Sequence, residues 1–158
     1  MIKMQTNVSL EKKRNMEYEI TNTITAEEYL EMRALVGWGG FPLEQAKAGI
    51  EHTTHICTFR KDGKVIGLVR LLWDHGYVVY IADVIVRPDF QGKGIGRELM
   101  NYAMNYIKSK LKPGWRIMVN LQAAKGKEGF YKKFGFIERP NEDFGPGMHQ
   151  WICSEEES

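Results

Sequence analysis

The sequence has 158 residues, which is the size of one domain at roughly 150 residues per domain. Hydrophobic residues make up 43% and charged residues 27% of the chain; these fractions exclude collagen-like, disordered and disulfide-dense proteins. The formal net charge is +2, from 22 basic and 20 acidic residues, a balance that does not favour binding to nucleic acid or to an anionic membrane. We therefore expect neither partner.

The chain termini and the two cysteines indicate the domain bounds and the cellular compartment of the protein. Residues 1–15 have few apolar side chains, and no apolar run reaches the ~18 residues of a membrane-spanning helix. We predict a loose leader over 1–15, one domain over 16–153, an acidic tail over 154–158 and a cytoplasmic protein. Cys57 and Cys153 have no CxxC pattern or nearby His, so we interpret each as a buried reduced thiol and expect no disulfide and no metal.

The first third of the chain predicts a strand and two helices. Alternating apolar residues are typical of an edge strand, and Thr25 with Glu28 forms the capping box of a helix. Pro42 suits the first turn of a second helix. The glycine-rich loop before it contains Trp38 and Phe41 and is a candidate lid. We expect these three elements over residues 17–23, 25–36 and 42–50.

Three strands of an antiparallel meander follow. Asp62-Gly63 is a strong hairpin signal between the first two. The third strand is apolar on both faces, so we expect it at the centre of the sheet and covered on both sides; Asp83 is its only charged residue. The three strands are expected over His55–Lys61, Lys64–Trp73 and Tyr77–Val86.

The second half predicts a long helix and a mixture of shorter elements. Apolar residues at helical spacing and a basic last turn indicate a helix over 94–111. Further elements are expected over 116–121 (strand), 127–134 (helix), 136–139 (strand) and 148–153 (strand). Together the elements predict an α/β (α+β) fold, with a mixed, mostly antiparallel sheet of six or seven strands and about four flanking helices.

The turn between the third meander strand and the long helix carries the most specific signal. Gly92, Gly94 and Gly96 allow backbone N–H groups to converge on an anion at a helix N-terminus, and Lys93 and Arg97 add positive charge. A plain turn needs only one glycine. A Walker A loop would have Ser or Thr after Gly-Lys, and a dinucleotide-binding loop follows the first strand of a parallel sheet. The sequence therefore predicts a phosphate site of another kind.

Two motifs resemble the GNAT superfamily of N-acetyltransferases. Val86 to Gly96 reads Val-x-Pro-x-x-Gln-x-x-Gly-x-Gly and is similar to the acetyl-CoA signature of that family. Phe130 to Phe136 resembles its Tyr-x-x-x-Gly-Phe segment, although Ala124 stands where many members carry Asn. The resemblance covers about residues 17–153.

The resemblance implies an acyl-CoA-dependent N-acyltransferase that uses acetyl-CoA and no metal. The acetyl group would pass directly to a primary amine of a small molecule, without an acyl-enzyme. Two alternatives stay open: acetylation of a protein or peptide amine, and a non-catalytic module that binds or senses CoA. Dimers are common in the family, so a homodimer is compatible with the resemblance.

The resemblance also assigns residues to the cofactor. The free peptide groups of Val84 and Val86 would pair with the pantetheine arm, and the N–H near Val84 would polarise the thioester carbonyl. Tyr131 would protonate the leaving thiolate, and Lys133 would be a further cofactor contact. The alternative for Tyr131 is a purely structural role, in which its ring packs in an aromatic cluster. The N–H groups that would bind the pyrophosphate belong to Gln91, Gly92, Lys93, Gly94, Ile95, Gly96 and Arg97.

The general base and the acceptor site are less strongly indicated. Asp83 is a candidate base, but a salt bridge to Arg70 explains a buried carboxylate equally well. By the resemblance, the acceptor amine would contact Trp38, Phe41, Asp83 and Phe144. For the aromatic residues of the loops, simple hinge packing is the alternative. Reserve candidates for the base are Glu44, Asp74 and His75.

Overall fold

The computed structural model describes residues 17–154. The predicted leader and all but the first residue of the predicted tail lie outside the described residues. The chain divides into two compact units, one ending at Leu121 and one beginning at Gln122, and each is described by itself.

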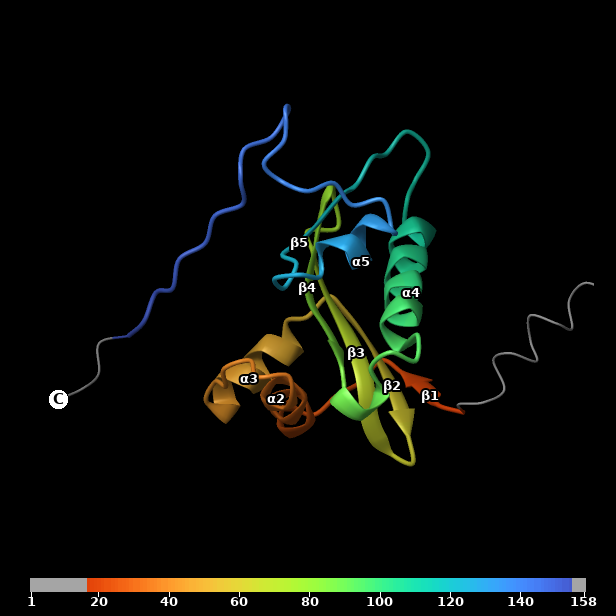
Figure 1. The fold of residues 1–158 in the computed structure, drawn as a ribbon, viewed down its shortest axis with the longest axis vertical. Coiled ribbons are helices and arrows are strands. Elements are labelled where there is room, and N and C mark those ends of the chain that lie inside the picture. Colours follow the sequence, from red (N-terminus) through yellow and green to blue (C-terminus); the bar gives the residue numbers. More distant parts are fainter. Residues whose placement is uncertain (1–16, 155–158) are drawn as a thin grey trace, which may run out of the picture. The chain divides into compact units, whose positions relative to one another are not determined.

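The first unit is built on a five-stranded sheet with the order β1-β2-β3-β4-β5 (Figure 1). All neighbouring strands are antiparallel except β4 and β5, which are parallel. The helices α2 and α3 lie on one side of the sheet and α4 on the other. The elements are β1 (Glu19–Thr21), α2 (Ala26–Leu35), α3 (Leu43–Glu51), β2 (His55–Lys61), β3 (Lys64–Trp73), β4 (Val78–Val86), the short 3₁₀ helix η1 (Pro88–Phe90), α4 (Ile95–Ser109) and β5 (Met118–Leu121).

The core on the α2 side joins both helices to the sheet. Its buried residues come from α2 and the segment just before it, α3, β2, β3 and β4, and the side chains of Trp38 and Phe41 pack against it. Burial of this apolar surface is the main force that holds the helices on the sheet. The buried members are Ile24, Ala26, Tyr29, Met32, Ala46, Ile56, Val65, Leu68 and Ile85.

On the other face, Gly67 of β3 allows α4 to approach closely. A Cβ atom at this position would lie 2.9 Å from Ile95 Cγ2 and 3.0 Å from Leu99 Cδ1, which is shorter than ordinary carbon contacts. Gly67 pairs with Val86 across the sheet. The first turn of α4 therefore packs against the sheet where β4 ends.

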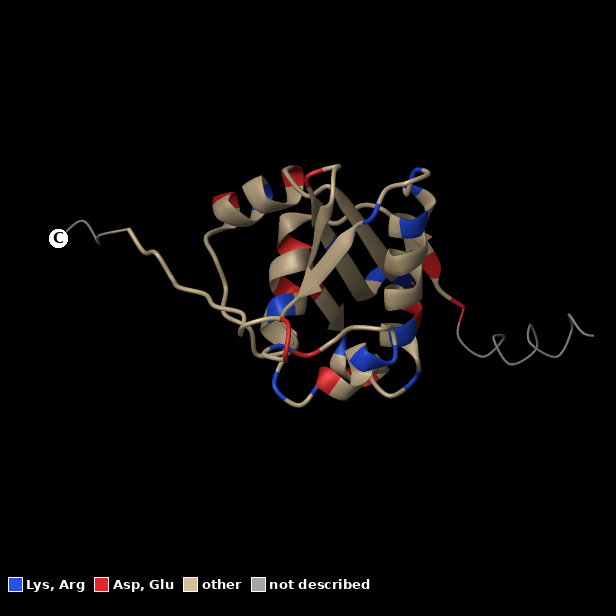
Figure 2. Cartoon of the chain, turned by 90° about the horizontal axis from the view of Figure 1, so that it is seen from above, with Lys and Arg blue, Asp and Glu red and all other residues tan. Residues whose placement is uncertain are grey.

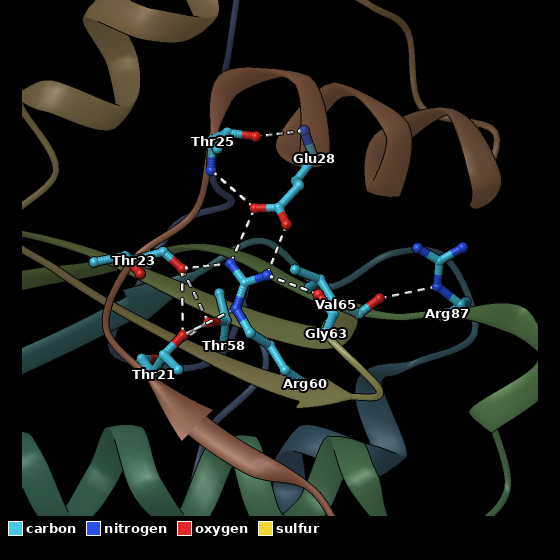
Figure 3. Close-up of polar contacts among 9 residues, drawn as sticks. All are labelled: Thr21, Thr23, Thr25, Glu28, Thr58, Arg60, Gly63, Val65 and Arg87. Atoms are coloured by element: carbon cyan, nitrogen blue, oxygen red, sulfur yellow. Dashed lines mark hydrogen bonds and ion pairs between the residues drawn. The ribbon is translucent and has the colours of Figure 1, made fainter.

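Polar contacts fix the start of α2 (Figure 3). The predicted capping box is present: Glu28 N donates to Thr25 Oγ1 at 3.1 Å, and Thr25 N donates to Glu28 Oε2 at 3.0 Å. Arg60 of β2 donates to both carboxylate oxygens of Glu28, at 2.6 and 2.9 Å. The hydrogen bond from Arg60 lowers the pKa of Glu28 to about 2, and the pair fastens α2 to the sheet.

The second unit contains the helix α5 (Glu128–Lys132) and little other regular structure. The predicted strands at 136–139 and 148–153 are wrong, because neither segment pairs with another strand among the described residues and an unpaired strand lacks its hydrogen-bonding partners. The exposed fractions of Met148, Trp151 and Ile152 are 89%, 78% and 86%. The sheet therefore has five strands rather than six or seven, while the predicted fold class is confirmed.

The cysteines differ from each other. Cys57 is buried on β2, as predicted, and burial raises the pKa of its thiol to about 12. Cys153 is exposed, so the prediction of a buried thiol is wrong there. It lies in the C-terminal segment that has no strand partner among residues 17–154.

Candidate functional site

The strand β4 extends beyond its parallel neighbour. The pairing with β5 runs only from Val78–Met118 to Ile81–Leu121. On the other side, β3 pairs with Asp83 and Ile81 but skips Ala82, which forms a bulge. Residues 82–86 therefore have a strand partner on one side only among the described residues.

The free edge of β4 carries the peptide groups of Val84 and Val86. Arg87 N donates to Ile66 O of the β3 strand at 2.8 Å. Along a β-strand, the N–H and C=O groups of successive residues point alternately to the two neighbouring strands. Because Arg87 N points to β3, the peptide groups of Val84 and Val86 point away from it. The Val86 carbonyl accepts a hydrogen bond from the Gln91 side chain at 3.0 Å. The peptide of Val84 is thus available to a ligand lying along this edge.

The side chains of β4 alternate between buried and half-buried positions. Asp83 and Ile85 are buried on the α2 side, whereas Val84 and Val86 are only half-buried. The prediction that this strand is covered on both sides is therefore met fully on one face and only in part on the other, along the whole strand.

The glycine loop forms an open helix N-terminus. Gly92 and Gly94 have φ angles of +73° and +87°, which side-chain-bearing residues rarely adopt. Gly94 is the N-cap of α4 and offers no side chain to cap it. A Cβ at Gly92 would meet no atom within 4 Å, and one at Gly94 would meet only Arg97 Nη2, at 3.7 Å.

The backbone donors of this loop are unengaged from Gly92 onward. No described residue accepts a hydrogen bond from the N–H groups of residues 92–97, and Glu98 N is the first to bond, to Gly94 O at 3.1 Å. The N–H of Gln91 instead donates to Pro88 O at 3.1 Å. Of the N–H groups predicted to bind a pyrophosphate, those of residues 92–97 are therefore unengaged, whereas the N–H of Gln91 is already bonded.

Positive charge accompanies these donors. The Lys93 ammonium lies 5.1 Å from the centre of the Phe90 ring, and the guanidinium of Arg97 lies near Gly94. Elsewhere, basic and acidic residues are interspersed along the chain (Figure 2), as the small net charge implies. The helix dipole, the free N–H groups and two cations together suit an anion such as a pyrophosphate.

Asp83 lies in a buried polar cluster between β4 and α2. Its side chain is 3% exposed, and the Oδ2 atom accepts hydrogen bonds from Arg70 Nε at 2.6 Å and from Tyr29 OH at 2.9 Å. Arg33 Nη1 lies 3.3 Å from the other oxygen, Oδ1. The predicted salt bridge to Arg70 is therefore confirmed, and Oδ1 is the less engaged of the two oxygens.

Two of the partners of Asp83, Tyr29 and Arg33, were not expected from the sequence. Both lie on α2, and their four-residue spacing places them on one face of the helix. Burial, and next the charge of Asp83, raise the pKa of Tyr29, so the phenol keeps its proton at neutral pH.

The predicted acceptor loop contacts the same cluster. The guanidinium carbon of Arg33 lies 5.3 Å from the centre of the Trp38 ring and 4.5 Å from that of Phe41. Arg33 Nε donates to Gly39 O at 3.2 Å. The structure therefore brings Trp38, Phe41 and Asp83 together around one arginine.

Three of the predicted site residues, Tyr131, Lys133 and Phe144, belong to the second unit. Tyr131 on α5 lies edge-on to Phe130 and Phe136, with ring centres 5.0 and 6.2 Å apart, so the expected aromatic cluster is present. Burial raises the pKa of Tyr131. Lys133 is exposed, and the Phe144 ring lies 5.1 Å from the Arg139 guanidinium.

The described residues 17–154 contain neither a metal-binding cluster nor a membrane-spanning helix. No group of three or more His, Cys, Asp or Glu side chains is placed to hold a metal ion. Within the same range, none of the helices has the length and apolar character needed to cross a membrane.

Of the reserve candidates for the base, Asp74 accepts hydrogen bonds from Gly76 N and Val78 N within its own turn.

Comparison with known proteins supports the resemblance. Residues 52–138 match the model of the acetyltransferase (GNAT) domain family. An uncharacterized N-acetyltransferase, ycf52, from Porphyra purpurea is 30% identical over 125 residues, covering 77% of this chain and 70% of that protein. Its namesake from Pyropia yezoensis is 32% identical over 110 residues, 67% of this chain and 61% of that protein.

Solved structures share the fold. A protein of meticillin-resistant Staphylococcus aureus described as a probable acetyltransferase has a TM-score of 0.76 and 27% identity, covering 85% of this chain and all of that one (100%). A GNAT family acetyltransferase from Streptococcus pneumoniae has a TM-score of 0.68 and 26% identity, covering 88% and 98%. The free edge of β4, the open N-terminus of α4 and these matches agree, and the chain belongs to the GNAT family of acyl-CoA-dependent acetyltransferases.

Proposed function

We propose that the protein transfers the acetyl group of acetyl-CoA directly to a primary amine of a small molecule. The observation that carries the proposal is the position of the free β4 edge next to the open N-terminus of α4. One surface then offers peptide groups to the amides of a pantetheine arm and N–H donors to a pyrophosphate. A fold neighbour with 18% identity, AAC(6')-Iy, was solved with a CoA bisubstrate analogue.

The residues of the loop and strand would divide the binding of acetyl-CoA between them. The N–H groups of residues 92–97 and the side chains of Lys93 and Arg97 would hold the phosphates, and the edge at Val84 would orient the arm. Acetyl-CoA supplies an activated thioester. The Val84 N–H would donate to the carbonyl oxygen as negative charge develops there, and the loss of one such donor costs about 3 kcal/mol of transition-state stabilisation in known cases.

Asp83 would receive the proton of the amine, directly or through water. Its Oδ2 atom already accepts two short hydrogen bonds, so Oδ1, with its single contact at 3.3 Å, is the oxygen suited to this role. As the amine nitrogen bonds to the carbonyl carbon, the carbon–sulfur bond breaks. By the family resemblance, Tyr131 would then protonate the departing thiolate; a phenol, with its ordinary pKa of ~10, carries a proton at neutral pH, and the thiolate is a good leaving group that needs little help.

We take a small molecule as the acceptor because aromatic side chains in the loop after α2 could hold the alkyl or aryl part of an amine. Trp38 and Phe41 are half-buried and pack on the core around Arg33, so the packing alternative also accounts for their position.

Calorimetry and an amine screen test the proposal. We expect acetyl-CoA to bind with micromolar affinity, or about 8 kcal/mol, and free thiol to be released when a small primary amine from a panel of alkyl-, arylalkyl- and polyamines is added. Turnover only with lysine-containing or N-terminal peptides would favour the protein-acetylating alternative. Binding without turnover of any amine or peptide would favour the CoA-sensing module, and absence of binding by folded protein would refute the cofactor site.

A further inference from the structure

We propose that Arg33 is a positioning residue that ties the loop after α2 to the carboxylate of Asp83. This inference rests on the proposed function, because it assigns the loop to the acceptor side of the site. The guanidinium of Arg33 reaches both partners at once: Nη1 lies 3.3 Å from Asp83 Oδ1, and Nε donates to Gly39 O at 3.2 Å.

The loop has few other constraints. Gly37 N and Trp38 N bond back to the end of α2, at 3.0 and 2.9 Å. From Gly39 to Phe41, the contact with Arg33 Nε is the one hydrogen bond to any described residue. A Cβ atom at Gly39 or Gly40 would meet nothing within 4 Å. One arginine and the packing of two aromatic rings therefore hold this part of the loop.

On the side of the sheet, Arg33 contacts Oδ1, the oxygen of Asp83 with fewer hydrogen bonds. Arg70 and Tyr29 both bind Oδ2, and Arg33 Nη1 also lies 3.5 Å from the Tyr29 hydroxyl. Arg33 is the only described group that donates to Oδ1. A single side chain thus sets the position of the loop relative to the oxygen suited to receive the proton of the amine.

A purely structural role is the alternative, and the chain offers a matched control for it. Arg60 also joins α2 to the sheet through a carboxylate, that of Glu28 (Figure 3). It donates no hydrogen bond to a described residue of the loop after α2. If Arg33 only fastens the helix, then Arg33→Ala and Arg60→Ala should have the same consequences.

Amide hydrogen exchange of the full chain separates the two roles without an acceptor. We expect exchange at Gly37 and Trp38 to be at least about tenfold faster in Arg33→Ala than in Arg60→Ala, since a hydrogen bond to a charged group is lost next to the loop. Arg33→Lys should show an intermediate effect, because one ammonium cannot reproduce the two-sided contact of the guanidinium. If Arg33→Ala does not fold, Arg33→Lys takes its place in the comparison with Arg60→Ala. Equal exchange in the Ala variants would overturn the proposal.

Kinetics with an amine identified in the panel gives the second readout. We expect Arg33→Ala to raise KM for the amine about tenfold while KM for acetyl-CoA changes less than twofold, and Arg60→Ala to change neither. A positioning role would be contradicted if Arg33→Ala raised the KM values for the amine and for acetyl-CoA equally, or raised neither. If the wild-type protein turns over no amine, the proposed function fails and the exchange experiment still decides how the loop is held.

Discussion

Replacing Gly67 by Ala tests how the helix that begins at the glycine loop is positioned. The new Cβ would lie 2.9 Å from Ile95 Cγ2 and 3.0 Å from Leu99 Cδ1, about 0.5–1 Å closer than carbon atoms normally pack. Both neighbours are buried, with exposed fractions of 2% and 0%, so they have little room to move. Overpacking of this kind costs about 1–3 kcal/mol.

A smaller stabilising effect, on the entropy of the unfolded chain, opposes the cost of overpacking. Replacing glycine by alanine restricts the unfolded chain and stabilises the folded state by about 0.4–1 kcal/mol. We therefore expect Gly67→Ala to lower the free energy of unfolding by about 0.5–2 kcal/mol. The first turn of α4 would also shift away from β3, and the glycine loop would move with it, so we expect affinity for acetyl-CoA to fall several-fold.

Urea unfolding and calorimetric titration measure the two effects. Gly49→Ala is the matched control, because Gly49 lies in the exposed part of α3 and a Cβ there meets no atom within 4 Å. This substitution should stabilise the protein by about 0.5–1 kcal/mol and leave affinity for acetyl-CoA unchanged. If Gly67→Ala were as stable as Gly49→Ala and bound acetyl-CoA equally well, the reasoning about the close approach of α4 would be refuted.

Three further predictions concern the loop, the proposed acid and the anchor of α2. Gly94→Glu should abolish acetyl-CoA binding in calorimetry, because it puts a negative charge and a strained φ of +87° at the loop; unchanged affinity would contradict the assignment. Tyr131→Phe should lower turnover by 10²-fold or more with little change in acetyl-CoA affinity, and equal turnover would return Tyr131 to a packing role. The Arg60–Glu28 pair should add about 1 kcal/mol after solvent screening at pH 7. Because the pKa of Glu28 is lowered from 4.5 to about 2, this contribution is complete above pH 4.5 and disappears as the pH falls towards 2. Urea unfolding of wild type and Glu28→Gln over this range should converge, and a gap that persists at pH 2 would argue against the pair.

Local patterns predicted most of the first unit. The meander strands, the capping box at Thr25 and Glu28, and the helix after the glycine loop depend on neighbours close in sequence. The structure has them within a few residues of the expected bounds. The two C-terminal strands were wrong because a strand depends on a partner that its own sequence does not specify.

The site was predicted only in part, for the same physical reason. The motif around Gly94 indicated the loop because its donors and its positive-φ positions are contiguous in the chain. The partners of Asp83 on α2 are 54 and 50 residues away in the sequence, and a tyrosine and an arginine on a helix carry no signal of what they contact. Their four-residue spacing on the buried side of α2 was the available hint. The cytoplasmic location and a homodimer stay predictions.

The free edge of β4 also bears on how the ligand-free protein behaves in solution. A row of unpaired peptide groups on a sheet is a template for any other extended chain, and here it runs over residues 82–86. The Gln91 side chain covers one acceptor of this edge, which leaves the remainder to be covered by a bound ligand. The arrangement that would receive the cofactor is thus also an aggregation hazard, and saturation with acetyl-CoA should protect the protein during purification and refolding.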